Sequence, residues 1–150
     1  GGTRAPIAAG RPETLLEGGD GLIVACGTLL GGALEAARRL REEGLEVGVI
    51  NARFVKPLDT TALLERIEAA PWVVTVEENA LPTGFGSAVL EAINDARISC
   101  GPVVRLGLPD RFVEHGERAE LLADLGLDAA GIAKTCRSLA ASARPNVPCP

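Results

Sequence analysis

Residues Gly21–Cys26 read Gly-Leu-Ile-Val-Ala-Cys, an unbroken apolar run that is typical of a strand buried on both faces. The next segment, Thr28–Glu43, has apolar side chains at helical spacing, and its opposite face carries arginines and a glutamate. Gly44 is a natural stop for this helix. A second apolar run, Leu45–Ile50, indicates another strand. This part of the chain therefore predicts a β-α-β unit with two parallel strands.

The alternation of strands and helices continues toward the C-terminus, so the sequence predicts a mostly parallel sheet covered by helices on both faces, a three-layer α/β sandwich. Small residues at the start of one helix, Gly84–Ser87, allow it to approach the sheet closely. The further predicted elements are a helix at Asp59–Ala69, a strand at Trp72–Val76, a loop at Glu77–Thr83, a helix at Gly84–Asp95, a strand at Pro102–Leu106, and helices at Glu117–Leu125 and Asp128–Ala141.

The two ends of the chain differ from its middle. The first twenty residues are rich in Gly and Pro and include a short predicted edge strand at Pro12–Leu16. We therefore expect residues 1–20 to be a linker with an edge strand, 21–141 to be one domain, and 142–150 to be a disordered tail. The chain begins Gly1-Gly2 without a methionine, and we expect it to be a piece of a longer protein.

The composition describes a folded, acidic domain. The 150 residues are 47% hydrophobic and 23% charged, which excludes an intrinsically disordered chain. The formal net charge is −5, so nucleic acids and anionic membranes are poor partners on charge alone. There is neither a membrane-spanning apolar run nor a signal-peptide pattern at the N-terminus. We therefore expect a cytoplasmic protein that binds neither nucleic acid nor membrane.

The four cysteines lack the spacing of a metal site, and the chain has one histidine, His115. Cys26 and Cys136 fall on apolar faces, which predicts small core side chains. Cys100 and Cys149 lie beside Gly or Pro, which predicts reduced thiols at the surface of a cytosolic protein.

Polar side chains gather in the loops that follow the predicted strands, where open α/β sheets bind their ligands. Gly27–Gly32 lacks the glycine patterns of dinucleotide and phosphate loops, and we interpret it as a tight turn. Glu77 and Glu78 are adjacent, so their side chains start out on opposite faces of a strand, which disfavours a paired acid and base. One of them is expected to face solvent or a partner, and the other to pair with Arg53 or Lys56.

Other residues of these loops have structural interpretations. Lys56 is expected to pair with Asp59 or Glu77, and Asn79 to shape its loop. His115 is expected to order its loop or to lie at an interface, because the sequence places no nucleophile beside it. No catalytic, cofactor-binding or metal-binding residue is predicted. The candidates for interface or loop-structuring roles are Arg53, Phe54, Lys56, Glu77, Glu78, Asn79, Asp110 and His115.

These loops also carry a family resemblance that covers residues 6–141. Four segments resemble, in order, those of the C-terminal domain of the 1-deoxy-D-xylulose-5-phosphate synthase family, which is a transketolase C-terminal domain. Four matching segments in the same order are far more specific than any one motif. The segments are Asn51–Asp59, Val74–Ala80, Gly107–Gly116 and Leu125–Ile132.

The resemblance implies a five-stranded mixed sheet with one antiparallel edge strand. It also implies a parent transferase, dependent on thiamine diphosphate and Mg²⁺, that condenses pyruvate with glyceraldehyde 3-phosphate to make precursors of isoprenoids and vitamins, thiamine among them. In that family other domains hold the cofactor and the catalytic residues, and none of those residues maps onto this chain. The isolated chain is therefore expected to be inactive. Its expected partners are the remaining domains of the same enzyme and, in a homodimer, a second subunit.

Two alternatives stay open at this point. One is the equivalent domain of a transketolase or of a 2-oxoacid dehydrogenase beta chain. The other is a stand-alone Rossmann-like or flavodoxin-like binding module, although the chain lacks a glycine fingerprint and is only 3% aromatic. A domain that packs on others should also expose an apolar patch, which we expect beside Phe54, Phe85 and Phe112.

Overall fold

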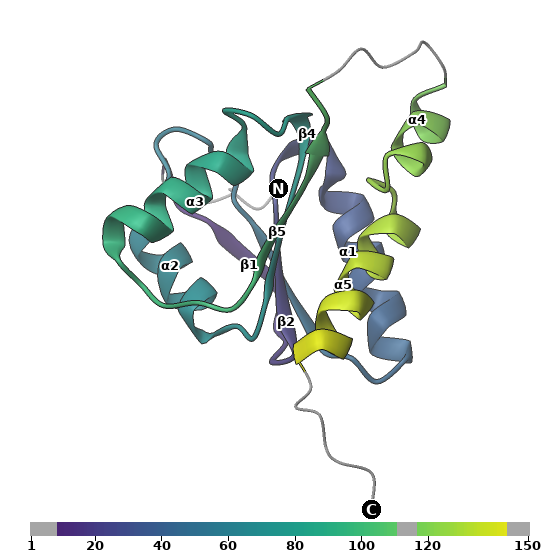
Figure 1. The fold of residues 1–150 in the computed structure, drawn as a ribbon, viewed down its shortest axis with the longest axis horizontal. Helices are drawn as coiled ribbons and strands as arrows, with labels where there is room; N and C mark the ends of the chain where they lie inside the picture. Colours follow the sequence, from purple (N-terminus) through teal and green to yellow (C-terminus); the bar gives the residue numbers. More distant parts are fainter. Residues whose placement is uncertain (1–8, 111–116, 144–150) are drawn as a thin grey trace, which may run out of the picture.

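One five-stranded sheet organises the chain in the computed structural model, which describes residues 9–110 and 117–143 (Figure 1). Its strand order is β1-β3-β2-β4-β5. The edge strand β1 is antiparallel to β3, and the other neighbours are parallel, as predicted. The strands are β1 (Glu13–Leu16), β2 (Gly21–Ala25), β3 (Val47–Asn51), β4 (Val73–Ala80) and β5 (Val103–Leu108).

Helices cover both faces of the sheet, which confirms the three-layer arrangement. Figure 1 shows α1 and α5 on one side and α2 and α3 on the other. Alternate side chains of each strand enter opposite layers: Ile23 packs in the core under α1 and α5, whereas Leu22 and Val24 pack under α2 and α3. The helices are α1 (Leu30–Glu42), α2 (Thr60–Ala69), α3 (Phe85–Ala96), α4 (Arg118–Asp124) and α5 (Ala129–Ala143).

The prediction of a loop at Glu77–Thr83 is wrong for the first half of this segment, because β4 continues to Ala80. Ala80 still pairs with Leu108 of β5, beyond an irregularity in the ladder. The polar residues after Val76 ended the predicted strand, yet the first of them, Glu77, is fully buried.

The turn after β2 has the predicted form. Gly27–Leu29 make a single 3-10 turn that leads into α1, and Gly27 has φ +77°, which favours glycine. Gly44, with φ +82°, follows the end of α1 as expected.

The described chain enters the sheet at the edge where the parallel strands end. Because β1 is antiparallel to β3, its first residue, Glu13, lies opposite the last residue of β3, Asn51. Just before β1, the carbonyl of Gly10 accepts the N–H of Asp59 at 2.9 Å, in the loop that follows β3. We call this side of the sheet the carboxyl edge.

Candidate functional site

The candidate residues that the structure describes all come from segments at the carboxyl edge. Arg53, Phe54 and Lys56 lie in the loop after β3. Glu77, Glu78 and Asn79 lie in the second half of β4, and Asp110 follows β5. His115 lies outside the described residues. The structure therefore brings the candidates to one side of the fold, although their individual contacts differ from those expected.

Glu77 does not pair with Arg53 or Lys56, contrary to the prediction. Its side chain is fully buried, and its carboxylate accepts the backbone N–H groups of Phe85 at 2.6 Å and Gly86 at 2.8 Å. These groups belong to the first turn of α3, whose N–H donors have no partner within the helix. The partial positive charge of that helix end stabilises the buried carboxylate.

The glycines around Glu77 make room for this contact. A Cβ atom on Gly84 would overlap the Glu77 carboxylate and the carbonyl of Ala80. A Cβ atom on Gly86 would lie 2.6 Å from Oγ1 of Thr75. The prediction that small residues let α3 approach the sheet closely is therefore confirmed.

Arg53 pairs with Glu13 of β1, at 2.5 Å between Nη2 and Oε2. Its backbone is left-handed, with φ +59°, and its N–H donates to Oδ1 of Asn51 at 3.0 Å. A left-handed arginine is uncommon and requires such support from neighbouring groups. A shallow groove of about 460 Å³ lies beside it and is lined by Glu13, Gly27, Leu30, Asn51, Arg53 and Phe54.

The side chain of Glu78 connects β4 with α4 and with the 3-10 turn at Gly27–Leu29. Arg118 of α4 donates from Nε to Oε1 of Glu78 at 3.0 Å and from Nη2 to Oε2 at 2.6 Å. Oγ1 of Thr28 also donates to this carboxylate and accepts from Nη2 of Arg118 at 3.2 Å. The bond from Arg118, and secondly that from Thr28, lowers the pKa of Glu78 below its ordinary value. Sequence reasoning missed Arg118 because its partner is forty residues away and no local pattern links them.

Lys56 is exposed and forms no ion pair with Asp59 or Glu77 among the described residues, contrary to expectation.

The apolar patch expected beside Phe54, Phe85 and Phe112 is only partly present. Phe54 is half-buried and its neighbour Val55 is exposed, but Phe85 is 1% exposed and belongs to the core. Phe112 lies outside the described residues.

A second braced segment follows β4. The carbonyl of Leu81 accepts Nη1 of Arg105 at 2.9 Å and Oγ of Ser87 at 2.8 Å, and its N–H donates to the carbonyl of Leu108 at 2.8 Å. Arg105 also donates to Ser87 Oγ at 2.8 Å. Sequence reasoning placed Arg105 in a strand without a role, because its side chain reaches across to α3 only in the folded chain.

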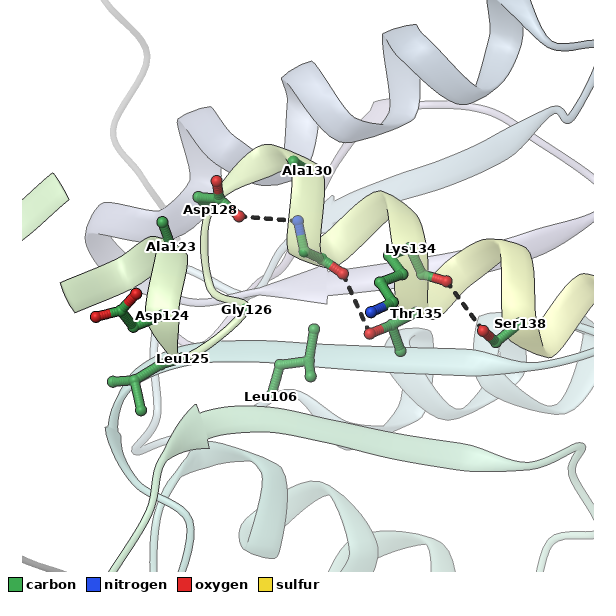
Figure 2. Close-up of a pocket in the computed structure, with 11 residues that line it drawn as sticks. Leu106, Ala123, Asp124, Leu125, Gly126, Asp128, Ala130, Lys134, Thr135 and Ser138 are labelled. Carbon is green, nitrogen blue, oxygen red and sulfur yellow. Dashed lines mark hydrogen bonds between the residues drawn. The ribbon is translucent and has the colours of Figure 1, made fainter. Parts of the chain in front are cut away.

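A larger groove, of about 640 Å³, lies between β5 and the α4–α5 segment (Figure 2). Figure 2 shows Leu106 pointing from β5 toward α5, with Lys134 and Thr135 on that helix. The hydroxyls of Thr135 and Ser138 donate to carbonyls one turn back in α5, at 3.2 Å each. The hydroxyls of Thr135 and Ser138 are therefore engaged with the helix backbone. None of the candidate residues lines this groove.

The described cysteines are free thiols. Cys136 is fully buried, and burial raises its pKa to about 12. Cys26 is half-buried rather than fully buried; burial, and secondly the charge of Glu77, raises its pKa. Cys100 was expected at the surface but is half-buried against the core. Cys149 lies outside the described residues.

Within residues 9–110 and 117–143, no group of three or more His, Cys, Asp or Glu side chains could hold a metal ion. In the same residues no helix is both long and apolar enough to cross a membrane.

Comparison with known proteins identifies what this chain is similar to. The family model described as the C-terminal domain of transketolase matches residues 10–132. The chain is 51% identical over 136 residues to 1-deoxy-D-xylulose-5-phosphate synthase 1 of Geobacter sulfurreducens, covering 91% of this chain and 21% of that protein. It is 49% identical over 133 residues to 1-deoxy-D-xylulose-5-phosphate synthase of a Synechococcus strain, covering 89% of this chain and 20% of that protein. The chain therefore spans about a fifth of the length of these curated relatives.

Solved structures agree on the fold. A structure described as a split-gene transketolase, inactive beta4 tetramer, has a TM-score of 0.82 and 35% identity, covering 93% of this chain and 45% of that one. A transketolase of Pichia stipitis has a TM-score of 0.64 and 20% identity, covering 87% of this chain and 18% of that one, and shows the fold alone. These matches confirm the family resemblance carried by the four sequence segments.

Proposed function

The chain belongs to the transketolase C-terminal domain family, and from that premise we propose that it is the C-terminal domain of a 1-deoxy-D-xylulose-5-phosphate synthase. One observation carries the proposal: relatives of that name are 45–51% identical over nearly all of this chain. The parent enzyme would condense pyruvate with glyceraldehyde 3-phosphate in the supply of isoprenoid and thiamine precursors. We further propose a cytoplasmic location, which the free thiols of the described residues support, and a homodimeric parent enzyme.

Within such an enzyme we assign this domain a structural role. The family cofactor, thiamine diphosphate with Mg²⁺, requires oxygen ligands for the metal and donors for the diphosphate. The described residues do not fit it, because they contain no metal-holding cluster and because Arg53, beside the start of α1, is paired with Glu13. We therefore propose that the cofactor chemistry belongs to the remaining domains, and we propose these domains as the partners of the carboxyl edge.

The solved structure of a split-gene transketolase supports the proposal that this domain alone has no catalytic activity. Its description calls the beta tetramer inactive, and this chain matches 45% of that beta chain. We expect this chain alone to be inactive as well.

A transketolase is the second candidate for the parent enzyme. It is supported by the fold match, but identity falls from 51% with the synthase of Geobacter to 35% and 20% with the two transketolases. The synthase assignment therefore explains the sequence better.

The test is a domain exchange. In the Geobacter synthase, this chain replaces the matched C-terminal region, and carboligation of pyruvate with glyceraldehyde 3-phosphate is measured with thiamine diphosphate and Mg²⁺. We expect turnover by the chimera and none by the 150-residue chain alone. Turnover by the isolated chain would contradict the structural role, and a folded chimera without turnover would contradict the synthase assignment.

A further inference from the structure

The segment Asn79–Thr83, at the carboxyl edge, combines an exposed tip with a fixed base. Four of its five residues are exposed, and the middle one, Leu81, is half-buried. Loops of this kind, held by a rigid scaffold, are where proteins place recognition residues. We call this segment the tip loop.

The tip loop is fixed by contacts with two other elements, β5 and α3. Both polar backbone groups of Leu81 are engaged, its carbonyl by Arg105 and Ser87 and its N–H by Leu108. Beside the tip loop, the Glu77 carboxylate accepts two backbone N–H groups from the start of α3. A loop restrained in this way loses little conformational freedom when a partner binds, so more of the contact energy appears as affinity.

The tip loop also contains a strained residue. Thr83 has φ +60°, in the left-handed region that β-branched residues avoid. Strained positions of this kind persist where the surrounding structure imposes them, and they cluster at functional segments. Recognition of another surface is a function of this kind.

The tip loop carries no charged residue, and the adjacent Glu78 is paired with Arg118. Depletion of charge is typical of the central part of a protein interface. The partner therefore presents a neutral protein surface rather than a phosphate or a nucleic acid.

The path of the chain indicates which protein surface that is. The described chain enters through β1 from the carboxyl edge, as the contact of Gly10 with Asp59 shows. In the order β1-β3-β2-β4, the entry strand is three strand spacings, or roughly 14 Å, from the strand that carries the tip loop. The described chain therefore begins on the side of the sheet that presents the loop, which is where we infer a preceding domain to lie.

From these observations we propose that the tip loop is a preformed docking element that seats this domain against the preceding, cofactor-binding part of the synthase. The inference rests on the proposed function and adds to it the contact surface, the neutral chemistry of that surface, and the residues that position it. Arg105 and Glu77 are positioning residues, because they act on the loop and do not themselves contact the partner.

The first test is amide hydrogen exchange, measured on the 150-residue chain and on the Geobacter chimera described above. The backbone amides of the tip loop, which all its residues except Pro82 carry, should exchange at least tenfold more slowly in the chimera, while those of Asn94–Arg97, at the other end of α3, should exchange equally in both. Equal exchange of the tip loop in the two proteins would overturn the docking role.

The second test uses matched substitutions of exposed residues. Ala80→Glu and Asn79→Ala alter the tip loop, and Ala96→Glu and Asn94→Ala make the same changes at the far end of α3. All four should leave the urea midpoint of the isolated chain nearly unchanged. In the chimera, A80E should reduce carboligation at least tenfold and N79A at least threefold, with the two controls within twofold.

The outcomes separate the two proposals. An active chimera in which A80E and N79A behave like their controls would reject the docking loop and leave the synthase assignment intact. A folded chimera that has no activity before any substitution would reject the synthase assignment and, with it, the inference that rests on it.

Discussion

The buried carboxylate of Glu77 accepts the backbone N–H of Phe85 at 2.6 Å and so ties the end of β4 to the start of α3. The adjacent N–H, that of Gly86, donates to the other carboxylate oxygen. This one side chain replaces a conventional N-cap, because Gly84 precedes the helix and offers no side-chain acceptor. It also sets the direction in which the chain leaves the sheet at the carboxyl edge.

Glu77→Gln should destabilise the domain. The amide nitrogen of glutamine is a donor, so one of the two buried N–H groups would face another donor and lose its acceptor. Leaving such a group unsatisfied costs about 1–3 kcal/mol. Urea unfolding measures the change, and Glu91→Gln, on the exposed face of the same helix, should stay within about 0.5 kcal/mol of the parent. Equal midpoints for the two variants would contradict the bracing role.

Two glycine-to-alanine substitutions should have opposite signs. At Gly86 a Cβ atom would lie 2.6 Å from Thr75 Oγ1 and 3.0 Å from Arg105 Cδ, so G86A should cost about 1–3 kcal/mol. At Gly31, in the first turn of α1, a Cβ atom would meet nothing within 4 Å, so G31A should stabilise by about 0.4–1 kcal/mol. Thermal unfolding of both variants gives the signs, and a stabilising G86A would show that α3 can move away from the sheet.

Local patterns predicted most of the fold. The apolar runs at Gly21–Cys26 and Trp72–Val76 correspond to β2 (Gly21–Ala25) and to the first half of β4 (Val73–Ala80), because a buried parallel strand needs apolar side chains on both faces. Asp128 begins α5 as expected, and its Oδ1 accepts the N–H of Gly131 at 2.8 Å. Asp59 stands at the predicted start of α2 but makes no side-chain capping bond there.

The contacts at the carboxyl edge were not predictable in the same way. The burial of Glu77 depends on a helix end eight residues downstream and on glycines that leave it space. The partner of Glu78, Arg118, is forty residues away. A polar residue at a strand end indicates exposure in a single sequence, and only the folded chain shows which such residues have buried or distant partners.

Cys136 should make stability depend on alkaline pH. Its folded pKa, about 12, lies above the ordinary 9.0, so its stabilising contribution is complete below pH 9 and is lost as pH rises toward 12. Between these values the unfolded chain releases a proton that the folded chain keeps, which lowers stability by about 1.4 kcal/mol per pH unit. Urea midpoints from pH 8 to 10.5 should therefore fall less steeply for Cys136→Ala than for the parent. Parallel slopes would show that the thiol ionises without unfolding.

Two carboxylates, Glu78 and Glu43, should titrate independently of each other, each under the control of its own arginine. Hydrogen bonds from Arg118 lower the pKa of Glu78, and those from Arg137 lower the pKa of Glu43, in both cases below the ordinary value of 4.5. A lowered folded pKa means that each contact stabilises the fold above about pH 4.5 and is lost as pH falls through the lower folded value. Side-chain carbon NMR should thus give both carboxylates midpoints below 4.5 in the parent chain.

The two arginine variants then serve as controls for each other. Arg118→Gln should return the Glu78 midpoint toward 4.5 and leave Glu43 unchanged, and Arg137→Gln should do the reverse. Because Arg137 and Glu43 join α5 to α1, whereas Arg118 and Glu78 join α4 to β4, a shift of both midpoints in one variant would mean that the helices move together. A Glu78 midpoint that stays low in R118Q would assign its depression to Thr28 instead, and α4 would then be held at the carboxyl edge without the help of this ion pair.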